Sequence, residues 1–185
     1  RRVIDSASCD ISAANVGEAE LVLIATPVAA LAAVCRAAAP LLRPDAIVSD
    51  VGSTKQSALA AFAEHLPQHL PQCVAAHPIA GSDRSGALAA QFGLYQDKKL
   101  ILCPHETQNP EAEALVGRLW QAVGAQIFRM SAQEHDAVFA AVSHLPHILA
   151  FAYVHQILDH ADGATYLDFA ATGFRDFTRI ASSQR

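Results

Sequence analysis

His77 is the residue of this chain whose type and position best fit chemistry. It ends a short apolar run, residues 73–77, and a loop of small residues, 78–86, follows it. An imidazole has an ordinary pKa of about 6.5, so it can take up or release a proton near neutral pH. In open α/β sheets, ligands bind beyond the carboxyl ends of the strands. A histidine at such a place indicates a general base, and a histidine that only packs in the core is the alternative.

Two other segments follow apolar runs in the same way. Residues 25–28 (ATPV) and 50–55 (DVGSTK) combine small residues, which let a ligand approach the backbone, with hydroxyl groups that can orient it. Both segments also have an ordinary structural interpretation. Pro27 suits the first turn of a helix, and Ser53 or Thr54 can cap one.

The second half of the chain contributes a pair of histidines, His144 and His147. Ser143 is predicted to cap a helix whose first turn holds both, and there the helix dipole favours the neutral imidazole. A pair three residues apart shares one helical face and could instead bind a metal. Because no carboxylate or cysteine stands at a matching short spacing, we expect no metal.

Two arginines four residues apart, Arg175 and Arg179, lie among aromatic residues in the segment 173–179. At this spacing they share one helical face. Guanidinium groups bind carboxylates in a fixed planar geometry, so the pair could clamp an anion. A solvated surface of alternating charges is the alternative.

The composition is typical of a globular protein. Of the 185 residues, 52% are apolar and 17% are charged, and the formal net charge is −5. No run of Lys and Arg is present, so we expect no nucleic-acid partner. The apolar stretch 145–158 is interrupted by polar residues and is shorter than the about 20 residues of a membrane span, which predicts a core helix and no membrane. Widely spaced cysteines are typical of reduced, cytosolic thiols, and the chain has four: Cys9, Cys35, Cys73 and Cys103.

The order of apolar runs predicts the fold. Short β-rich runs alternate with alanine-rich stretches between residues 20 and 130, which is typical of strand-helix units around a parallel sheet. The predicted strands are 21–25, 46–51, 73–77, 99–103 and 126–130, and the predicted helices are 27–39, 53–65 and 110–123, with Gly124 as a stop signal. Helical periodicity then continues from 131 to 162. We therefore predict an α/β domain over residues 1–130 and an all-helical domain over 131–185.

Four segments, in this order along the chain, resemble motifs of the prephenate and arogenate dehydrogenase family of tyrosine biosynthesis: 50–55 (DVGSTK), 77–82 (HPIAGS), 143–147 (SHLPH) and 173–179 (GFRDFTR). The resemblance covers residues 3 to 183. It implies a partial Rossmann-like domain followed by a helical domain for substrate binding and dimerisation, in a cytoplasmic homodimer. It further implies NAD(P)-dependent oxidative decarboxylation of prephenate to 4-hydroxyphenylpyruvate or of arogenate to tyrosine. Prephenate against arogenate and NAD against NADP are left open.

The resemblance also implies a role for each candidate residue. His77 would take the proton of the C4 hydroxyl as the hydride departs, and Ser53 would help to hold that hydroxyl. The residues implied to bind the substrate are His144, His147, Arg175 and Arg179. The residues implied to lie beside the dinucleotide are Thr26, Pro27, Val51, Gly52 and Ser82.

One part of the family pattern has no counterpart in this sequence. The glycine-rich turn and the residue that selects the cofactor belong to a first strand-helix-strand unit, and residues 1–11 resemble the segment just after that unit. The chain also stops soon after the arginine motif, where the family continues through further helices.

Two other functions compete with this one. A 3-hydroxy acid dehydrogenase of related fold would use a lysine base, which residues 131–162 lack. A non-catalytic binding protein would be favoured by the loss of His77 or Arg179, and both are present.

Overall fold

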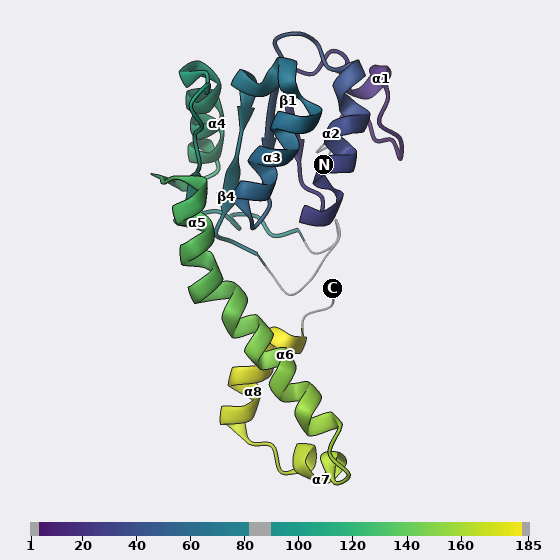
Figure 1. Cartoon of the computed structure of the whole chain (residues 1–185), viewed down its shortest axis with the longest axis vertical. Helices are drawn as coiled ribbons and strands as arrows, with labels where there is room; N and C mark the ends of the chain where they lie inside the picture. Colours follow the sequence, from purple (N-terminus) through teal and green to yellow (C-terminus); the bar gives the residue numbers. More distant parts are fainter. Residues whose placement is uncertain (1–3, 82–89, 183–185) are drawn as a thin grey trace. The chain divides into compact units, whose positions relative to one another are not determined.

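The computed structural model describes residues 4–81 and 90–182. The chain divides into two compact units (Figure 1). The first comprises residues 1–80 and 93–136, and the second comprises residues 81–92 and 137–185. The first unit is α/β and the second is helical, so the predicted fold class, a parallel-sheet domain followed by a helical domain, is confirmed.

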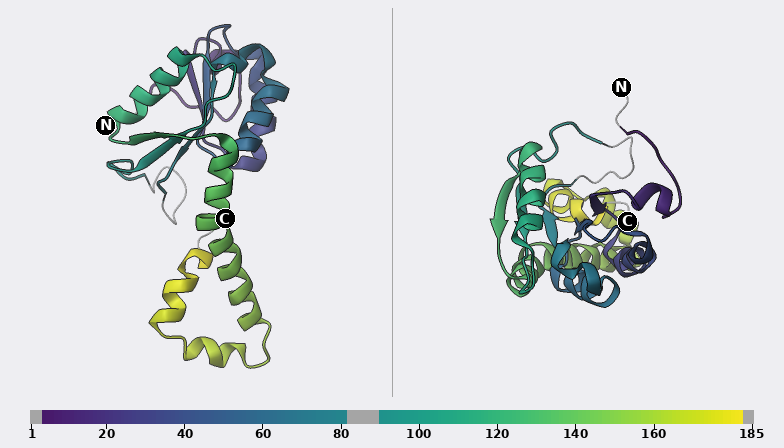
Figure 2. Two further views of the ribbon diagram at one scale, coloured as in Figure 1. Left: turned by 60° about the vertical axis from the view of Figure 1, so that its left-hand side comes forward. Right: turned by 90° about the horizontal axis from the view of Figure 1, so that it is seen from above.

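A parallel sheet forms the first part of the α/β unit. Its strands β1 (Leu21–Ile24), β2 (Ile47–Asp50) and β3 (Cys73–Val74) are parallel and adjacent in that order. The connecting helices α2 (Leu31–Ala38) and α3 (Lys55–His65) pack on one face of the strands, opposite the helix α4 (Pro110–Ala122) (Figures 1 and 2). β2 and β3 are the more deeply buried of these strands, whereas Leu23 of β1 is 42% exposed.

The predicted strand 73–77 is in fact two strands. β3 ends after Val74, and β4 (Ala76–Pro78) pairs antiparallel with β5 (Lys99–Leu102), which in turn pairs parallel with β6 (Gln126–Arg129). The change of partner occurs at Ala76, whose N–H and carbonyl both bind side chains, those of Asp50 and Lys55. These two side chains replace the next rung of the β2–β3 ladder, and the chain turns into the second sheet.

The helix α4 (Pro110–Ala122) covers the second sheet. Asn109 caps it by accepting the Glu111 N–H at 2.9 Å. Its face contributes to a core cluster of Val74, Ala76, Leu100, Leu102, Ala112, Val116, Trp120 and Ala125. The predicted stop at Gly124 is confirmed: this glycine has a φ of 93°, and a Cβ there would lie 2.4 Å from the Gln96 side chain. Short helical turns complete the unit: α1 (Ala13–Val16), η1 (Val28–Ala30), η2 (Ala39–Leu41) and η3 (Pro67–Gln72).

One long helix, residues 132–158, leads from the first unit into the second. It consists of α5 (Ala132–Phe139), a π-helical turn (Ala140–His144) and α6 (Leu145–Leu158). The predicted helix start at Ser143 is therefore wrong, and both His144 and His147 lie in the middle of a helix, away from its dipole ends. Pro146 has no N–H to continue the α-helical pattern, and the wider turn before it keeps the helix unbroken.

The second unit continues with α7 (Gly163–Asp168), α8 (Thr172–Thr178) and a 3₁₀ turn, Arg179–Ser182. Tyr153 of α6 packs against Phe174 and Phe177 of α8, with ring centroids 5.5 and 5.9 Å apart. These aromatic contacts hold α8 against α6.

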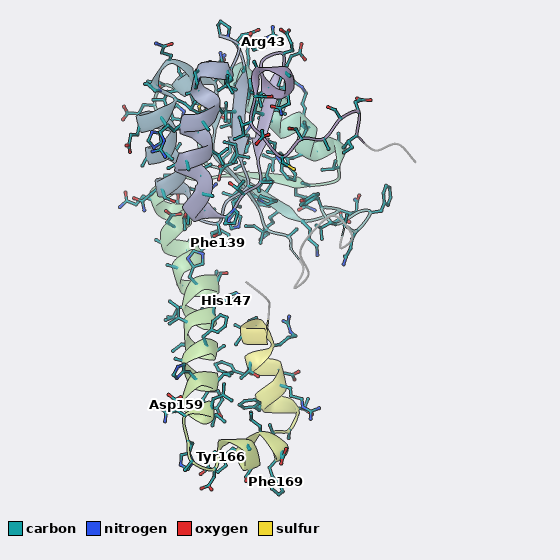
Figure 3. All side chains as sticks on the ribbon, turned by 90° about the vertical axis from the view of Figure 1, so that its right-hand side faces the viewer. Arg43, Phe139, His147, Asp159, Tyr166 and Phe169 are labelled. Atoms are coloured by element: carbon teal, nitrogen blue, oxygen red, sulfur yellow. The ribbon has the colours of Figure 1, made fainter. Side chains whose placement is uncertain are left out.

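The long helix is apolar and largely uncovered in the single chain. By length and composition it could cross a membrane, with a mean hydropathy of 1.6 over its best 18 residues, of which 6% are buried. Figure 3 shows the side chains of this helix as sticks along its whole length. The prediction of a core helix over 145–158 is wrong for this chain, because the following apolar side chains are exposed: Leu145, Ile148, Leu149, Tyr153 and Leu158.

Candidate active site

A buried ion pair lies at the carboxyl end of β2. Lys55 Nζ donates to Asp50 Oδ2 at 2.5 Å and to the Ala76 carbonyl at 2.6 Å, and the two charged side chains are 0% and 1% exposed. The Asp50 carboxylate also accepts the N–H groups of Gly52 at 2.8 Å and Ala76 at 3.1 Å. A buried pair is tolerated when its remaining hydrogen bonds are made, as they are here. The pair fixes the turn after β2 to the start of β4, the strand that carries His77.

Burial lowers the pKa of the Lys55 ammonium, and the Asp50 carboxylate opposes that shift. The ion pair opposes the effect of burial without reversing it, and the two hydrogen bonds fix the place of the Lys55 side chain. Its role in this geometry is to hold the backbone, since its donors are directed at Asp50 and Ala76.

Two of the segments predicted to lie beside a cofactor meet at one edge of the sheet. Ile24 and Asp50 are register partners at the ends of β1 and β2, so the residues that follow, Thr26–Pro27 and Val51–Gly52, leave the sheet side by side. Gly52 allows the tight approach there, because a Cβ would lie 2.9 Å from Asp50 Oδ2 and 3.2 Å from Val28 Cγ2. Thr26 and Pro27 are exposed, while Val51 and Gly52 are half-buried.

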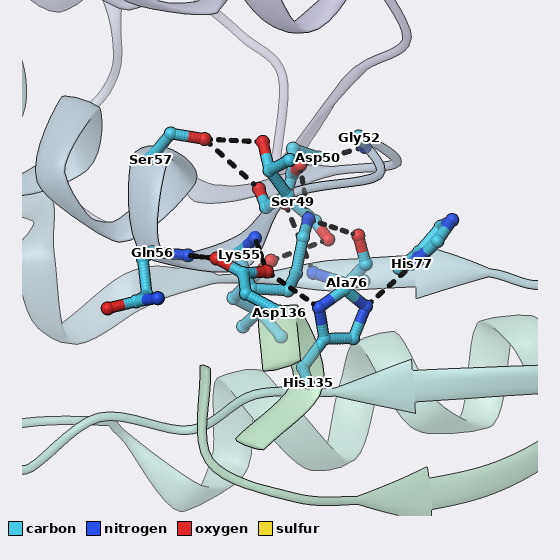
Figure 4. Close-up of polar contacts among 12 residues, drawn as sticks. Ser49, Asp50, Gly52, Lys55, Gln56, Ser57, Ala76, His77, His135 and Asp136 are labelled. Carbon is cyan, nitrogen blue, oxygen red and sulfur yellow. Dashed lines mark hydrogen bonds and ion pairs between the residues drawn. The ribbon is translucent and has the colours of Figure 1, made fainter. Parts of the chain in front are cut away.

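His77 belongs to a chain of hydrogen bonds with two residues of α5. Its Nδ1 lies 2.8 Å from Nε2 of His135, and Nδ1 of His135 lies 2.8 Å from Oδ1 of Asp136 (Figure 4). His135 is fully buried and His77 is half-buried. A histidine backed by a second histidine and a carboxylate can hold and move a proton, which is the chemistry predicted for His77.

Asp136 caps α3 from a distant part of the sequence. Its Oδ1 accepts the Lys55 N–H at 2.7 Å, and its Oδ2 accepts the Gln56 N–H at 2.9 Å. The predicted cap by Ser53 or Thr54 is wrong: Thr54 is at the N-cap position without a side-chain cap, and its hydroxyl pairs with Ser57. Burial raises the pKa of the Asp136 carboxyl, but the hydrogen bonds from Lys55, Gln56 and His135 outweigh it and lower the pKa overall.

The candidate residues of the second unit lie at the end of the π-helical turn (His144), on α6 (His147), on α8 and just after α8. His147 Nδ1 donates to the Ser143 carbonyl at 2.8 Å, which assigns the ring proton to that nitrogen, and both His144 and His147 are half-buried. Arg175 lies in α8 and Arg179 follows it in the 3₁₀ turn; both are exposed. No group of three His, Cys, Asp or Glu side chains that could hold a metal occurs within residues 4–81 and 90–182.

Three of the four cysteines are buried free thiols. Burial raises the pKa of Cys35 to about 11 and the pKa values of Cys73 and Cys103 to about 12. These thiols are therefore protonated near neutral pH and are poor nucleophiles.

Comparison with known families shows to which family this chain belongs. The model of the prephenate dehydrogenase nucleotide-binding domain matches residues 1–129, and the model of the prephenate dehydrogenase dimerization domain matches residues 131–184. The chain belongs to the prephenate dehydrogenase family. The resemblance predicted from the four motifs is thereby confirmed.

Individual relatives support the same assignment. The chain is 37% identical to a cyclohexadienyl dehydrogenase of Zymomonas mobilis, over 97% of the chain and 61% of that protein. It is 39% identical to a prephenate dehydrogenase of Bacillus subtilis, over 98% of the chain and 49% of that protein. The chain thus spans about half to three fifths of the length of these prephenate dehydrogenase relatives.

Solved structures of the family also match the fold. A prephenate dehydrogenase of Aquifex aeolicus, in complex with hydroxyphenyl propionate and NAD⁺, has a TM-score of 0.82 at 35% identity, over 89% of this chain and 57% of that chain. An arogenate dehydrogenase of Synechocystis has a TM-score of 0.74 at 25% identity, over 94% of this chain and 62% of that chain.

In this prephenate dehydrogenase family member, sequence reasoning singled out His77, whose catalytic role stays a prediction, but not the residues behind it. His135, Asp136 and the Asp50–Lys55 pair were given no role, although Asp50 and Lys55 lie inside a recognised motif. The available signal was the adjacent His135 and Asp136 in the first turns of a helix that soon becomes apolar. Ser53 is half-buried in the turn after β2, and its contact with substrate stays a prediction. Ser82 lies outside the described residues.

Proposed function

We propose that the protein containing this chain catalyses the NAD(P)-dependent oxidative decarboxylation of prephenate, arogenate or both, with His77 as the general base. The observation that carries the proposal is the position of His77, at a strand end and hydrogen-bonded to the buried His135, which Asp136 backs. Steady-state assays of the full-length protein, with each substrate and each cofactor, test it.

The residues at the sheet edge fit a dinucleotide. Thr26–Pro27 and Val51–Gly52 follow adjacent parallel strands, the usual place for ligands in such sheets. Gly52 lets this turn pack closely against Asp50 and Val28, because a Cβ there would lie 2.9 Å from Asp50 Oδ2 and 3.2 Å from Val28 Cγ2. The nicotinamide of NAD⁺ or NADP⁺ would supply the hydride acceptor there. The NAD⁺ in the complex of the Aquifex relative supports this cofactor class.

The chemistry assigned to His77 is a single proton transfer. As hydride leaves C4 of the substrate ring, the C4 hydroxyl becomes more acidic, and the imidazole takes its proton. The ring carboxylate leaves as CO₂ and its electron pair completes the aromatic ring, after which the proton can return to the phenolate oxygen. Ser53, in the turn after β2, is proposed to hold the hydroxyl during this step.

Arg175 and Arg179 are proposed to bind the anionic groups of the substrate, and His144 and His147 to contact the substrate from the same unit. Two of these side chains are guanidinium groups, which bind carboxylates in a paired planar geometry. The packing of Tyr153 against Phe174 and Phe177 gives the segment that carries the arginines a fixed place on α6.

Replacing Arg179 by Gln is expected to raise the KM for substrate about 10-fold to 100-fold, with a smaller change in kcat. A hydrogen bond to a charged group contributes about 1.5–3 kcal/mol, and glutamine keeps a donor but loses the charge. Steady-state kinetics of the full-length protein measure this effect. Arg36→Gln, at an exposed position of α2, is the matched control and should leave KM unchanged. An unchanged KM in Arg179→Gln would refute the assignment.

We also propose that the protein is a homodimer and acts in the cytoplasm. The dimerization-domain match over residues 131–184 and the exposed apolar side chains of the long helix support a second copy as the covering partner. The free cysteines are consistent with a reducing compartment. Sedimentation of the full-length protein should give twice the monomer mass, and a monomer at micromolar concentration would contradict the proposal.

A further inference from the structure

We infer that His135 and Asp136 are positioning residues that set the tautomer of His77. Asp136 orients His135, and His135 makes His77 carry its ring proton on Nδ1, so that the basic nitrogen of His77 is Nε2. The inference deepens the proposed function, on which its catalytic meaning rests. The tautomer itself can be measured without any turnover.

The charge of Asp136 follows from the groups around its carboxylate. Its two oxygens accept the backbone N–H groups of Lys55 and Gln56. The two N–H groups belong to the first turn of the 11-residue helix α3, whose positive dipole end favours an anion. The lowered pKa of the Asp136 carboxyl agrees with this arrangement. Asp136 is therefore an ionised carboxylate and can only accept hydrogen bonds.

The tautomer of His135 follows from that charge. Because Asp136 only accepts, His135 must donate from Nδ1. Full burial disfavours the imidazolium form of this ring, whereas the Asp136 carboxylate at 2.8 Å favours it, so the tautomer is defined at a pH above the loss of the second ring proton. A neutral ring with its proton on Nδ1 has an acceptor at Nε2.

The contact between the two rings then sets the tautomer of His77. Its Nδ1 lies 2.8 Å from Nε2 of His135, and the ring planes meet edge-on at 65° with centroids 5.1 Å apart. One of the two nitrogens must donate in this contact. Since Nε2 of His135 accepts, Nδ1 of His77 carries the proton, and its unprotonated nitrogen is Nε2, on the side of the ring away from His135 (Figure 4).

This arrangement suits a general base. When Nε2 of His77 takes a proton, Nδ1 still donates to His135, and no hydrogen bond in the chain has to break. The Asp136 carboxylate, one ring further along, then lies close enough to stabilise the positive charge. The same logic operates where a carboxylate orients a histidine base directly; here a second histidine transmits it.

Nuclear magnetic resonance of the full-length protein, with ¹⁵N-labelled histidine, tests the inference. Two-bond proton–nitrogen correlations, recorded well above the ordinary histidine pKa, distinguish the two tautomers of each ring, and loss of signals in His77→Asn assigns His77. We expect His77 to be protonated on Nδ1 in the unchanged protein. An unconstrained imidazole prefers the other tautomer, so a His77 ring that His135 does not constrain would not give this result.

Variants of His135 connect the tautomer to activity. His135→Phe removes the acceptor, so His77 should shift towards protonation on Nε2, and kcat should fall about 10-fold to 100-fold, the usual effect of removing a supporting partner. The KM for substrate should stay within about twofold. His135→Gln, whose amide can donate to Asp136 and accept from His77, should restore part of both properties. The control is His105→Gln, which removes an imidazole bonded to the Cys73 carbonyl and should change neither.

The possible failures are distinguishable. A His77 ring protonated on Nε2 in the unchanged protein overturns the inference, whatever the His135 variants do and whether or not they fold. An unchanged kcat in a folded His135→Phe overturns it as well. Full turnover in His77→Asn, with the expected tautomer in the unchanged protein, would instead refute the general-base role and leave the tautomer assignment standing.

Discussion

Replacing His77 by Asn is expected to lower kcat by about 10²-fold to 10⁴-fold, the usual contribution of a general base. Asparagine is close in size to histidine and can still bond to His135, but it cannot take a proton near neutral pH. The KM for substrate should change little, because the lost interaction stabilises the transition state more than the bound substrate. Steady-state kinetics of the full-length protein measure both constants.

The matched control for this variant is His105→Asn, in a loop histidine that bonds to Cys73 and Thr107. It should leave kcat within about twofold of the unchanged protein. Thermal unfolding should show that both variants are folded. Turnover of His77→Asn close to that of the unchanged protein would remove the general-base assignment.

Replacing Lys55 by Met is expected to reduce the free energy of unfolding by about 3–5 kcal/mol, the usual cost of removing one partner of a buried pair. Methionine fills a similar volume but leaves the Asp50 carboxylate, 1% exposed, without its counter-charge. The Ala76 carbonyl also loses its donor. Urea unfolding of the full-length protein measures the change.

A double variant separates the effect of charge from the effect of shape. Asp50→Asn combined with Lys55→Met removes both charges, so it should be more stable than Lys55→Met alone. Lys98→Met, at an exposed position, is the control and should change the stability by less than about 0.5 kcal/mol. A Lys55→Met protein as stable as the control would contradict a structural role for the pair. Loss of the pair should also loosen the start of β4, and with it the position of His77.

Most strands could be predicted because each contains a short β-rich apolar run near Pro, Gly or polar residues. The predicted strands at 21–25, 46–51, 99–103 and 126–130 each agree with the structure to within one residue at either end. The division of 73–77 into two strands could not be predicted. It depends on Asp50 and Lys55 reaching Ala76 across 26 and 21 residues of sequence.

In the candidate site, too, some residues could be predicted from the sequence and others could not. His77 could be found because it lies at a strand end within a recognisable motif. His135, which contacts the His77 ring, lies 58 residues further along the chain. Asp136 lies 81 residues beyond Lys55, whose N–H it accepts. The residue pattern of one segment does not predict contacts with segments so far away in the sequence. The apolar side chains of α6 led to the prediction of a core helix, but many of them are exposed in the single chain. An apolar pattern indicates that a helix is covered, but it does not indicate whether the same chain or another one covers it.

The central claim is that the family's oxidative decarboxylation takes place in the protein that contains this chain. The most direct measurement is the stoichiometry of turnover in the full-length protein: reduced nicotinamide and CO₂ formed together from prephenate or from arogenate, with NAD⁺ or NADP⁺. We predict equal amounts of both products with at least one pairing of substrate and cofactor. Failure to turn over either substrate with either cofactor, or reduction of the nicotinamide without release of CO₂, would contradict the account.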